Sequence, residues 1–300
     1  MAIPPTSDVD GLEGPPAILF ADLIPLLDIA DRGEDRFEAG HSELARVTGH
    51  VFGGLLAAQA LVAAGRTVDP ARTVHSLHAY FLRPGDATLP LHLEVTRSRD
   101  GRSFSHRRVD AVQDGKTILE LSCSFALPRE GLAHQRAAPA APQPEGLRND
   151  HDVLRELLPG APRPGMSPEA FDLRTAGLDH AWLTEPSPVT ETTQVWMRAG
   201  GPVPADPLLR AALLVFASDL RSLHPVLRPH GRSLYDDDVH PATIDHAVWI
   251  HRVPPVDEWL LWCWDSPWAD QGRGFVRATT YDRHGHLVAE ATQEGLIRIG

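Results

Sequence analysis

The sequence has very little lysine. Lys116 is the only lysine among 28 basic residues, so nearly every positive charge is carried by an arginine. The 40 acidic residues give a formal net charge of −12 at pH 7. Because nucleic acids and anionic membrane surfaces are bound by clustered positive charge, this balance argues against both as partners.

Cysteine and long apolar runs are also scarce. Cys123 and Cys263 are the only two cysteines, too few and too far apart for a disulfide framework or a metal knuckle. No apolar run approaches the ~20 residues that a membrane span needs. The first sixteen residues, "MAIPPTSDVDGLEGPP", lack the basic and apolar regions of a signal peptide. We therefore expect a cytoplasmic protein without a membrane span.

The rest of the composition is that of a globular protein. The 300 residues are 42% hydrophobic and 23% charged, which allows a sizeable core. At about 100 to 200 residues per domain, the length allows two domains.

Two stretches of the chain share one pattern. "GRSFSHRRVDAVQDGKTILELSCSFAL" begins at Gly101, and "GRGFVRATTYDRHGHLVAEATQEGLIR" begins at Gly272. Each reads Gly-Arg-x-Phe, an alternating strand, a turn with glycine and a second alternating strand, which predicts a β-hairpin. Upstream, "TVHSLHAYFLR" matches "ATIDHAVWIHR", and the apolar helix "GGLLAAQALVAAG" matches "LRAALLVFASDLRSL". The sequence thus predicts an α+β unit, given twice, with a buried helix wrapped by a curled sheet.

The composition also indicates where the domain boundaries lie. We expect a disordered tail over residues 1–16, a first unit over 17–128, a Pro-rich linker over 129–175 and a second unit over 176–300. The stretch "LPREGLAHQRAAPAAPQPEGLRND" is typical of a linker because proline and alanine without periodicity do not bury a core.

These motifs, in this order and spacing, resemble the TesB-type acyl-CoA thioesterases, the acyl-CoA thioesterase II family. The resemblance runs from "LIPLLDIADRGEDRFEAG" through "VFGGLLAAQAL" and "VHSLHAYFLRPGD" to "FASDL", "DEWLLW" and "QEGLIR". It implies a double hotdog fold with two antiparallel sheets, each wrapping a central helix. It also implies that fatty acyl-CoA is the substrate, hydrolysed to free acid and coenzyme A without a cofactor or metal.

The resemblance assigns the catalytic role to Asp219, Thr243 and Gln293. Strand alternation places Gln293 on the inward face, and helical spacing stacks Asp219 on apolar neighbours. In the first half, Cys123 stands at the position that matches Gln293, and Gln59 at the position that matches Asp219. We therefore expect one active site, in the second unit. These residue types fit the hydrolysis of a thioester by an oriented water, which needs a proton acceptor and hydrogen-bond partners.

Other residues are weaker candidates for substrate binding. Gly53 and Gly54 head a helix, where unpaired N–H groups favour negative charge on a thioester oxygen, although tight packing also explains them. His75 is a possible base, but most histidines in such strands are structural. Arg102 and Arg273 flank the hairpins and could bind the phosphates of coenzyme A, as could other arginines nearby, because the arginine side chain matches phosphate oxygens.

Several alternatives stay open. Asp236, Asp237, Asp238 and His240 look like a metal cluster, but consecutive aspartates in a loop are usually solvated. A hotdog enoyl-CoA hydratase and a non-catalytic acyl-CoA-binding protein remain possible functions. The α/β-hydrolase route has no support because the chain lacks a Gly-x-Ser-x-Gly elbow. A homo-oligomer is expected because a hotdog sheet leaves edges and an outer face that proteins tend to cover.

Overall fold

The computed structural model describes residues 19–42, 45, 51–158 and 170–300. The expected tail over residues 1–16 lies outside the described residues. All paired strands run antiparallel and form a single twelve-stranded sheet in the order β1-β2-β4-β5-β6-β3-β9-β12-β11-β10-β8-β7.

The first half of the chain forms one end of this sheet. Its helix α3 has no charged residue and is buried almost throughout, as an apolar helix must be. The predicted hairpin is confirmed, because β5 and β6 pair antiparallel. The elements are α1 (Phe20–Leu27), β1 (Ala30–Asp31), β2 (Arg36–Ala39), α3 (Gly53–Gly65), β3 (Thr73–Phe81), β4 (Leu91–Asp100), β5 (Phe104–Gln113) and β6 (Lys116–Ala126).

The second half repeats this arrangement with α6 in place of α3. Its hairpin is also confirmed, by the pairing of β11 with β12. The elements are α4 (Asp150–Leu157), β7 (Phe171–Thr175), α5 (His180–Thr184), β8 (Thr193–Ala199), α6 (Pro207–Ser218), α7 (His224–Leu227), β9 (Val239–Ile250), β10 (Leu260–Asp270), β11 (Arg273–Asp282) and β12 (Leu287–Ile299).

The two halves share one sheet, which corrects the expectation of two. Strands β3 and β9 pair with each other, with Ser76 opposite Trp249 and Tyr80 opposite Asp245. Without this pairing, each strand would expose a row of unpaired backbone groups at a sheet edge. On either side of this seam the strand order is the same, β3-β6-β5-β4-β2 and β9-β12-β11-β10-β8.

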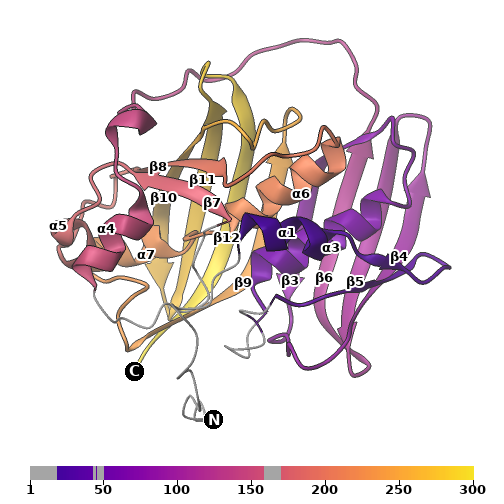
Figure 1. Ribbon diagram of the computed structural model, residues 1–300, viewed down its shortest axis with the longest axis horizontal. Helices are drawn as coiled ribbons and strands as arrows, with labels where there is room; N and C mark the ends of the chain where they lie inside the picture. The colour runs from indigo at the N-terminus through magenta and orange to yellow at the C-terminus, as the bar shows by residue number, and fades with distance from the viewer. Residues whose placement is uncertain (1–18, 43–44, 46–50, 159–169) are drawn as a thin grey trace.

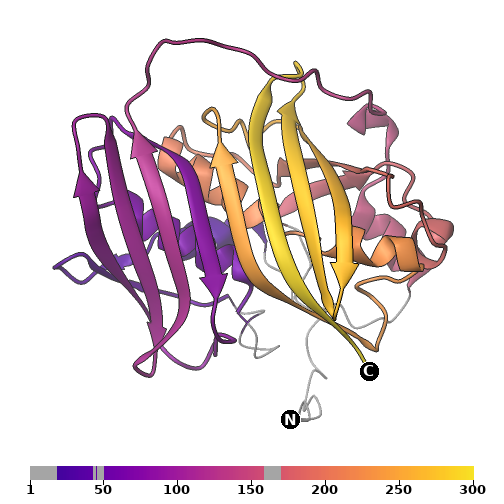
Figure 2. The ribbon, with the colours of Figure 1, turned by 180° about the vertical axis from the view of Figure 1, so that it is seen from behind.

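Helices α3 and α6 lie side by side on one face of the sheet (Figure 1). In the part of the chain that the structure describes, the opposite face carries no helix (Figure 2). The close approach of the helices depends on glycine, because a Cβ on Gly54 would lie 2.8 Å from the backbone oxygen of Phe216. The N-terminal end of α3 is thereby held against the C-terminal end of α6.

The connection between the halves is partly irregular. It crosses the top of the molecule in Figure 1 as an extended segment, and Trp196 in β8 donates a hydrogen bond to the Pro142 carbonyl at 2.8 Å. The range 129–175, expected to be a Pro-rich linker, also contains α4 and β7, and β7 is the last strand of the sheet. The boundaries of the two units remain predictions.

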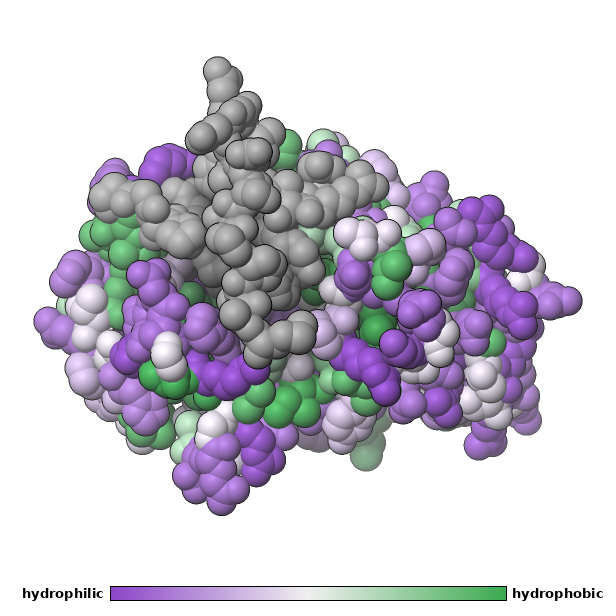
Figure 3. All heavy atoms as spheres, turned by 90° about the horizontal axis from the view of Figure 1, so that it is seen from below, coloured by the Kyte–Doolittle hydropathy of each residue, from purple (hydrophilic) through white to green (hydrophobic). Residues whose placement is uncertain are grey.

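Among the described residues, no helix is long and apolar enough to cross a membrane. Figure 3 views the molecule from below, where hydrophilic residues predominate among those drawn in colour and apolar residues form small separate groups.

Candidate active site

Asp219 lies at the end of α6, where the two central helices meet. Its side chain is almost fully buried, with the residue only 9% exposed. Oδ2 accepts a hydrogen bond from the Gly54 backbone N–H at 2.7 Å, and Oδ1 accepts one from Gln293 Nε2 at 3.0 Å. The carboxylate is therefore held by donors from both halves of the chain.

Thr243 and Gln293 complete the cluster from the neighbouring strands β9 and β12. Gln293 is fully buried and uses its second amide hydrogen to donate to Thr243 Oγ1 at 2.8 Å. The threonine oxygen accepts this bond, and its own hydroxyl donates to Asp219, which acts to lower the pKa of that carboxyl. The three residues that the sequence assigns to catalysis thus form one hydrogen-bonded group.

An irregularity in β9 is what turns Thr243 toward the site. Gln293 pairs with His246, and Gly295 pairs with Thr243, with a register shift between these pairs. In a regular strand, residues 243 and 246 would face opposite sides of the sheet. The extra residue reverses this alternation, as β-bulges beside active sites often do.

Burial sets the protonation of Asp219. Desolvation raises the pKa of this carboxyl from 3.8 to about 6, against the lowering effect of its hydrogen bonds from Gln293 and Gly54. Asp219 is therefore largely ionised at neutral pH, yet basic enough to accept a proton from water. A carboxyl of this kind is suited to general base catalysis.

The structure assigns Gly54 to positioning Asp219, because its N–H donates to the carboxylate. Gly53 is less crowded than Gly54 but still tight, since a Cβ there would lie 3.0 Å from Asp219 Oδ2. Both glycines therefore belong to the site through close packing and the amino end of α3, whose dipole favours the negative charge of Asp219.

A buried histidine supports the cluster and was missed in the sequence. His246 lies opposite Gln293 and contacts Ser218 Oγ through Nε2 at 2.7 Å. Because Ser218 donates its hydrogen to the Val215 carbonyl at 2.8 Å, Nε2 must be the donor to Ser218. Burial lowers the pKa of His246 to about 4, so the ring is neutral at pH 7. In the sequence, only the position of His246 within the predicted strand "TIDHAVWIH" could have indicated that it lies near the site.

The other candidates are not brought to this cluster. His75 contacts Ser124 Oγ at 2.8 Å and packs edge-on against Phe104, all within the first half. Arg102 is exposed in the turn between β4 and β5. Arg273 forms an ion pair with Glu294 at 2.9 Å. Among the described residues, no group of three or more His, Cys, Asp or Glu is placed to hold a metal ion.

The aspartates 236 to 238, considered as a metal cluster, have a different explanation. Arg232 Nε donates to Asp236 Oδ2 at 2.6 Å, and the same guanidinium also contacts Asp238. These acidic side chains therefore neutralise an arginine near the start of β9.

The first half has no second copy of the cluster. Gln59, which matches Asp219, is fully buried and donates to the carbonyls of Leu26 and Gly40 at 2.9 Å each. Cys123, which matches Gln293, has its pKa raised to about 12 by burial and so remains a thiol. Both residues serve the fold of the first half.

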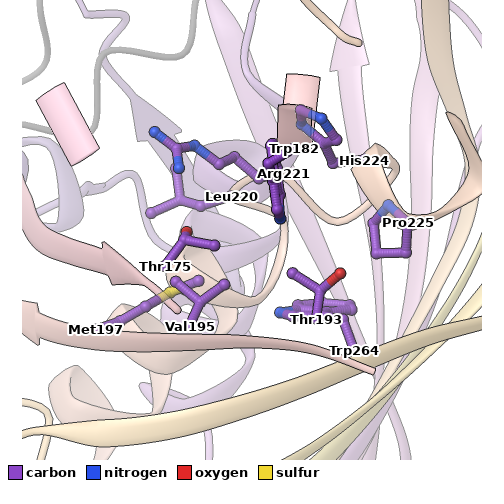
Figure 4. Close-up of a pocket in the computed structure, with 10 residues that line it drawn as sticks. All are labelled: Thr175, Trp182, Thr193, Val195, Met197, Leu220, Arg221, His224, Pro225 and Trp264. Carbon is purple, nitrogen blue, oxygen red and sulfur yellow. The ribbon is translucent and has the colours of Figure 1, made fainter. Parts of the chain in front are cut away.

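A small pocket with a cavity volume of about 10 Å³ lies beyond the end of α6 (Figure 4). Its wall includes Leu220 and Arg221, the two residues that follow Asp219 in the chain. The rest of the lining comes from the inner face of the sheet and from the α5 and α7 region and is mainly apolar: Thr175, Trp182, Thr193, Val195, Met197, His224, Pro225 and Trp264.

Comparison with known proteins decides the family. The model of the acyl-CoA thioesterase N-terminal domain matches residues 41–126, and the acyl-CoA thioesterase model matches residues 172–296. The chain belongs to the acyl-CoA thioesterase family. The resemblance that the sequence motifs indicated is thereby confirmed, and the two matched regions correspond to the two halves of the sheet.

Full-length relatives agree with this family. The chain is 34% identical to acyl-CoA thioesterase 2 of Haemophilus influenzae over 83% of this chain and 87% of that protein. It is 33% identical to acyl-coenzyme A thioesterase 8 of Homo sapiens over 95% of this chain and 92% of that protein. Among solved structures, the acyl-CoA thioesterase II TesB2 from Mycobacterium marinum matches with a TM-score of 0.76 and 36% identity, covering 93% of this chain and 97% of that one.

Proposed function

We propose that this protein hydrolyses acyl-CoA thioesters with a water molecule held by Asp219, Thr243 and Gln293. The observation that carries the proposal is the buried Asp219 carboxyl with a pKa of about 6, fixed by Gln293 and Gly54. The family supports the substrate class, since the similar proteins are named acyl-CoA thioesterases.

The reaction follows from these groups. Asp219 accepts a proton from water as the water oxygen attacks the thioester carbonyl carbon. The carbon–sulfur bond then breaks, and the proton passes from Asp219 to the departing thiolate. The products are a free acid and coenzyme A, and the carboxylate returns to its starting state. Thr243 and Gln293 orient the water, so no covalent intermediate with the protein is needed.

We propose that the acyl chain enters at the pocket of Figure 4, which opens further to take it, and that the coenzyme A stays outside the site. The pocket is mainly apolar and begins at the residue after Asp219. Apolar walls suit a hydrocarbon chain because its burial is favourable by about 25 cal/mol per Å² of surface. Arg102 and Arg273 remain candidates for contact with the phosphates of coenzyme A.

The test is release of free thiol from a medium-chain acyl-CoA by the purified protein. We expect Asp219→Asn to reduce kcat by ~10² to 10⁴ while leaving substrate binding, because it removes the proton acceptor and keeps the shape. Thr243→Ala and Gln293→Ala should each reduce kcat, and the double variant should lose less than the product of the two because the residues act as a unit.

His75→Ala is the control variant, since His75 lies apart from the cluster, and its effect should be mild. An inactive His75→Ala beside an active Asp219→Asn would refute the assignment. Hydration of an enoyl-CoA without thiol release would instead indicate a hydratase. Binding without either reaction would indicate a non-catalytic protein.

A further inference from the structure

Arg221, two residues after Asp219, has a backbone that arginine rarely adopts. Its φ is 58°, in the left-handed region that favours glycine. A non-glycine residue stays in that region only where the surrounding structure compensates for the strain. The sequence therefore uses an arginine, at a cost, where glycine would relieve the backbone, which indicates that the side chain has a role.

That side chain ends in a buried ion pair. Arg221 is 7% exposed, and its Nη1 donates to Oδ2 of Asp150, which is fully buried. Asp150 also accepts hydrogen bonds from the backbone N–H and the hydroxyl of Thr175, both at 2.6 Å. The partner of Arg221 is thus anchored to β7, and in Figure 4 the arginine side chain extends over Leu220.

The turn that Arg221 makes controls the surroundings of Asp219. After it, the Ser222 hydroxyl donates to the Asp219 carbonyl at 3.3 Å. Leu223 then packs so closely on β12 that a Cβ on Gly295 would lie 2.5 Å from its side chain. Gly295 is only two residues from Gln293. The turn therefore connects the end of α6 to the part of β12 that carries the glutamine.

We propose that the Asp150–Arg221 ion pair positions Asp219 for catalysis by fixing this turn against Gln293 and Gly54. Both members are positioning residues, since neither contacts the Asp219 carboxylate. Asp150 comes from the segment that connects the two halves, so this segment contributes to the active site. The inference rests on the proposed function of Asp219.

Removing only one member would leave a buried charge without its partner, which destabilises a fold strongly. The informative variant is therefore the double substitution Asp150→Asn with Arg221→Met. The asparagine oxygen can still accept from the Thr175 N–H, its amide can donate to the Thr175 hydroxyl, and methionine fills most of the arginine's apolar stem. This variant removes both charges and keeps both hydrogen bonds between position 150 and Thr175.

We expect the double variant to fold, with kcat reduced by about 10²-fold and KM little changed, because small displacements of a catalytic group have effects of this size. The acid limb of its pH profile should also move to higher pH, since a displaced Asp219 loses donors that lower its pKa. If the ion pair were purely structural, its removal would lower thermal stability without changing kcat or the acid limb of the pH profile.

The matched control is the ion pair between Arg210 and Asp257, with Nη1 to Oδ1 at 2.6 Å, at the opposite end of α6. The double substitution Arg210→Met with Asp257→Asn should leave kcat unchanged. If the Asp150–Arg221 double variant does not fold, the single variants Arg221→Lys and Arg221→Gly test the inference instead. A wild-type kcat in both single variants, together with lowered thermal stability, overturns the inference.

Asp219→Asn is measured in parallel. Wild-type kcat in the folded double variant, with Asp219→Asn inactive, overturns the positioning role and leaves the proposed function intact. Full activity of Asp219→Asn overturns the proposed function itself.

Discussion

At the scale of the residue, the proposed mechanism depends on keeping one carboxyl buried and still ionisable. Asp219 is surrounded by donors that stabilise its charge, but desolvation is the larger effect and raises its pKa to about 6. The result is a group that is charged at neutral pH and ready to accept a proton. A solvated aspartate with a pKa near 3.9 would be a weaker base.

This pKa predicts the acid limb of the activity. A protonated carboxyl cannot accept a proton from water, so kcat/KM should fall as the pH is lowered through about 6 and level off above it. The measurement is thiol release across about pH 3.5 to 8 at low substrate concentration. Asp219→Asn should show low activity without this limb. A wild-type limb near pH 4 would mean that burial does not raise the pKa of Asp219.

The residues of the site were predictable to different degrees. Strand alternation alone placed Gln293 inward, and the apolar face of the helix indicated burial of Asp219. Thr243 faces the site only because of an irregularity in β9 that its sequence does not reveal. Arg221 could not be predicted, because its importance lies in a left-handed backbone and in a partner 71 residues away.

At the scale of the element, the candidate site exists because two helices pack side by side, with the start of α3 against the end of α6. Gly54 permits this contact, since a Cβ at that position would lie 2.8 Å from the Phe216 carbonyl and 2.9 Å from Asp219 Cβ. The backbone carbonyl cannot rotate away as a flexible side chain could. Because Gly54 lacks a Cβ, α3 can lie this close to the Asp219 carboxylate.

Gly54→Ala should therefore reduce both activity and stability. Overpacking of this kind costs about 1–3 kcal/mol of unfolding free energy, and the displaced α3 would weaken the 2.7 Å bond from Gly54 to Asp219. Thermal unfolding and thiol release measure the two effects. Gly146→Ala is the control, because nothing lies within 4 Å of its Cβ position. Equal thermal stability and equal activity of the two variants would contradict the packing argument.

The pocket beyond α6 allows a prediction about chain length. Val195 lies on β8 with its side chain in the pocket wall, so Val195→Phe should keep the pocket from opening around a long acyl group. We expect the preferred substrate to become shorter in a chain-length series assayed by thiol release. Val189→Phe is a control in an exposed loop position. An unchanged preference in Val195→Phe would place the acyl chain elsewhere.

The elements themselves were easier to predict than their assembly. Periodicity and turn residues gave both hairpins and both apolar helices, because these signals are local. Nothing local indicates that the edge of β3 meets the edge of β9, since backbone pairing between edges requires no particular side chains. The single continuous sheet therefore emerged only in the structure.

At the scale of the whole molecule, a duplicated unit carries one candidate active site. The first half keeps Gln59 and Cys123 where the second has Asp219 and Gln293, and its glutamine instead binds carbonyls of its own half. The first half still contributes to the site, because the Gly54 N–H belongs to it. Neither half alone would hold the carboxylate as the complete chain does.

The sheet face without helices also has a consequence for assembly (Figure 2). It carries aromatic side chains, including Tyr80, which is 57% exposed, and Phe104, which is 47% exposed. Trp249 packs edge-on against His78 across the seam between the halves. Aromatic side chains are enriched in protein interfaces because they bury large areas. We therefore predict that the protein associates with itself through this face.

Light scattering should then return a mass above that of the 32.8 kDa chain at micromolar concentration. Tyr80→Arg should shift the protein toward the monomer without unfolding it, because position 80 lies opposite Glu120 and Asp245, which can pair with the new charge. Leu132→Arg is the matched control, since Leu132 is fully exposed in the connection between the halves and should leave the mass unchanged. A monomeric mass for the wild-type protein would contradict the prediction. An oligomer unaffected by Tyr80→Arg would place the interface on another surface, because an added positive charge in the middle of an aromatic contact must lose its water on association.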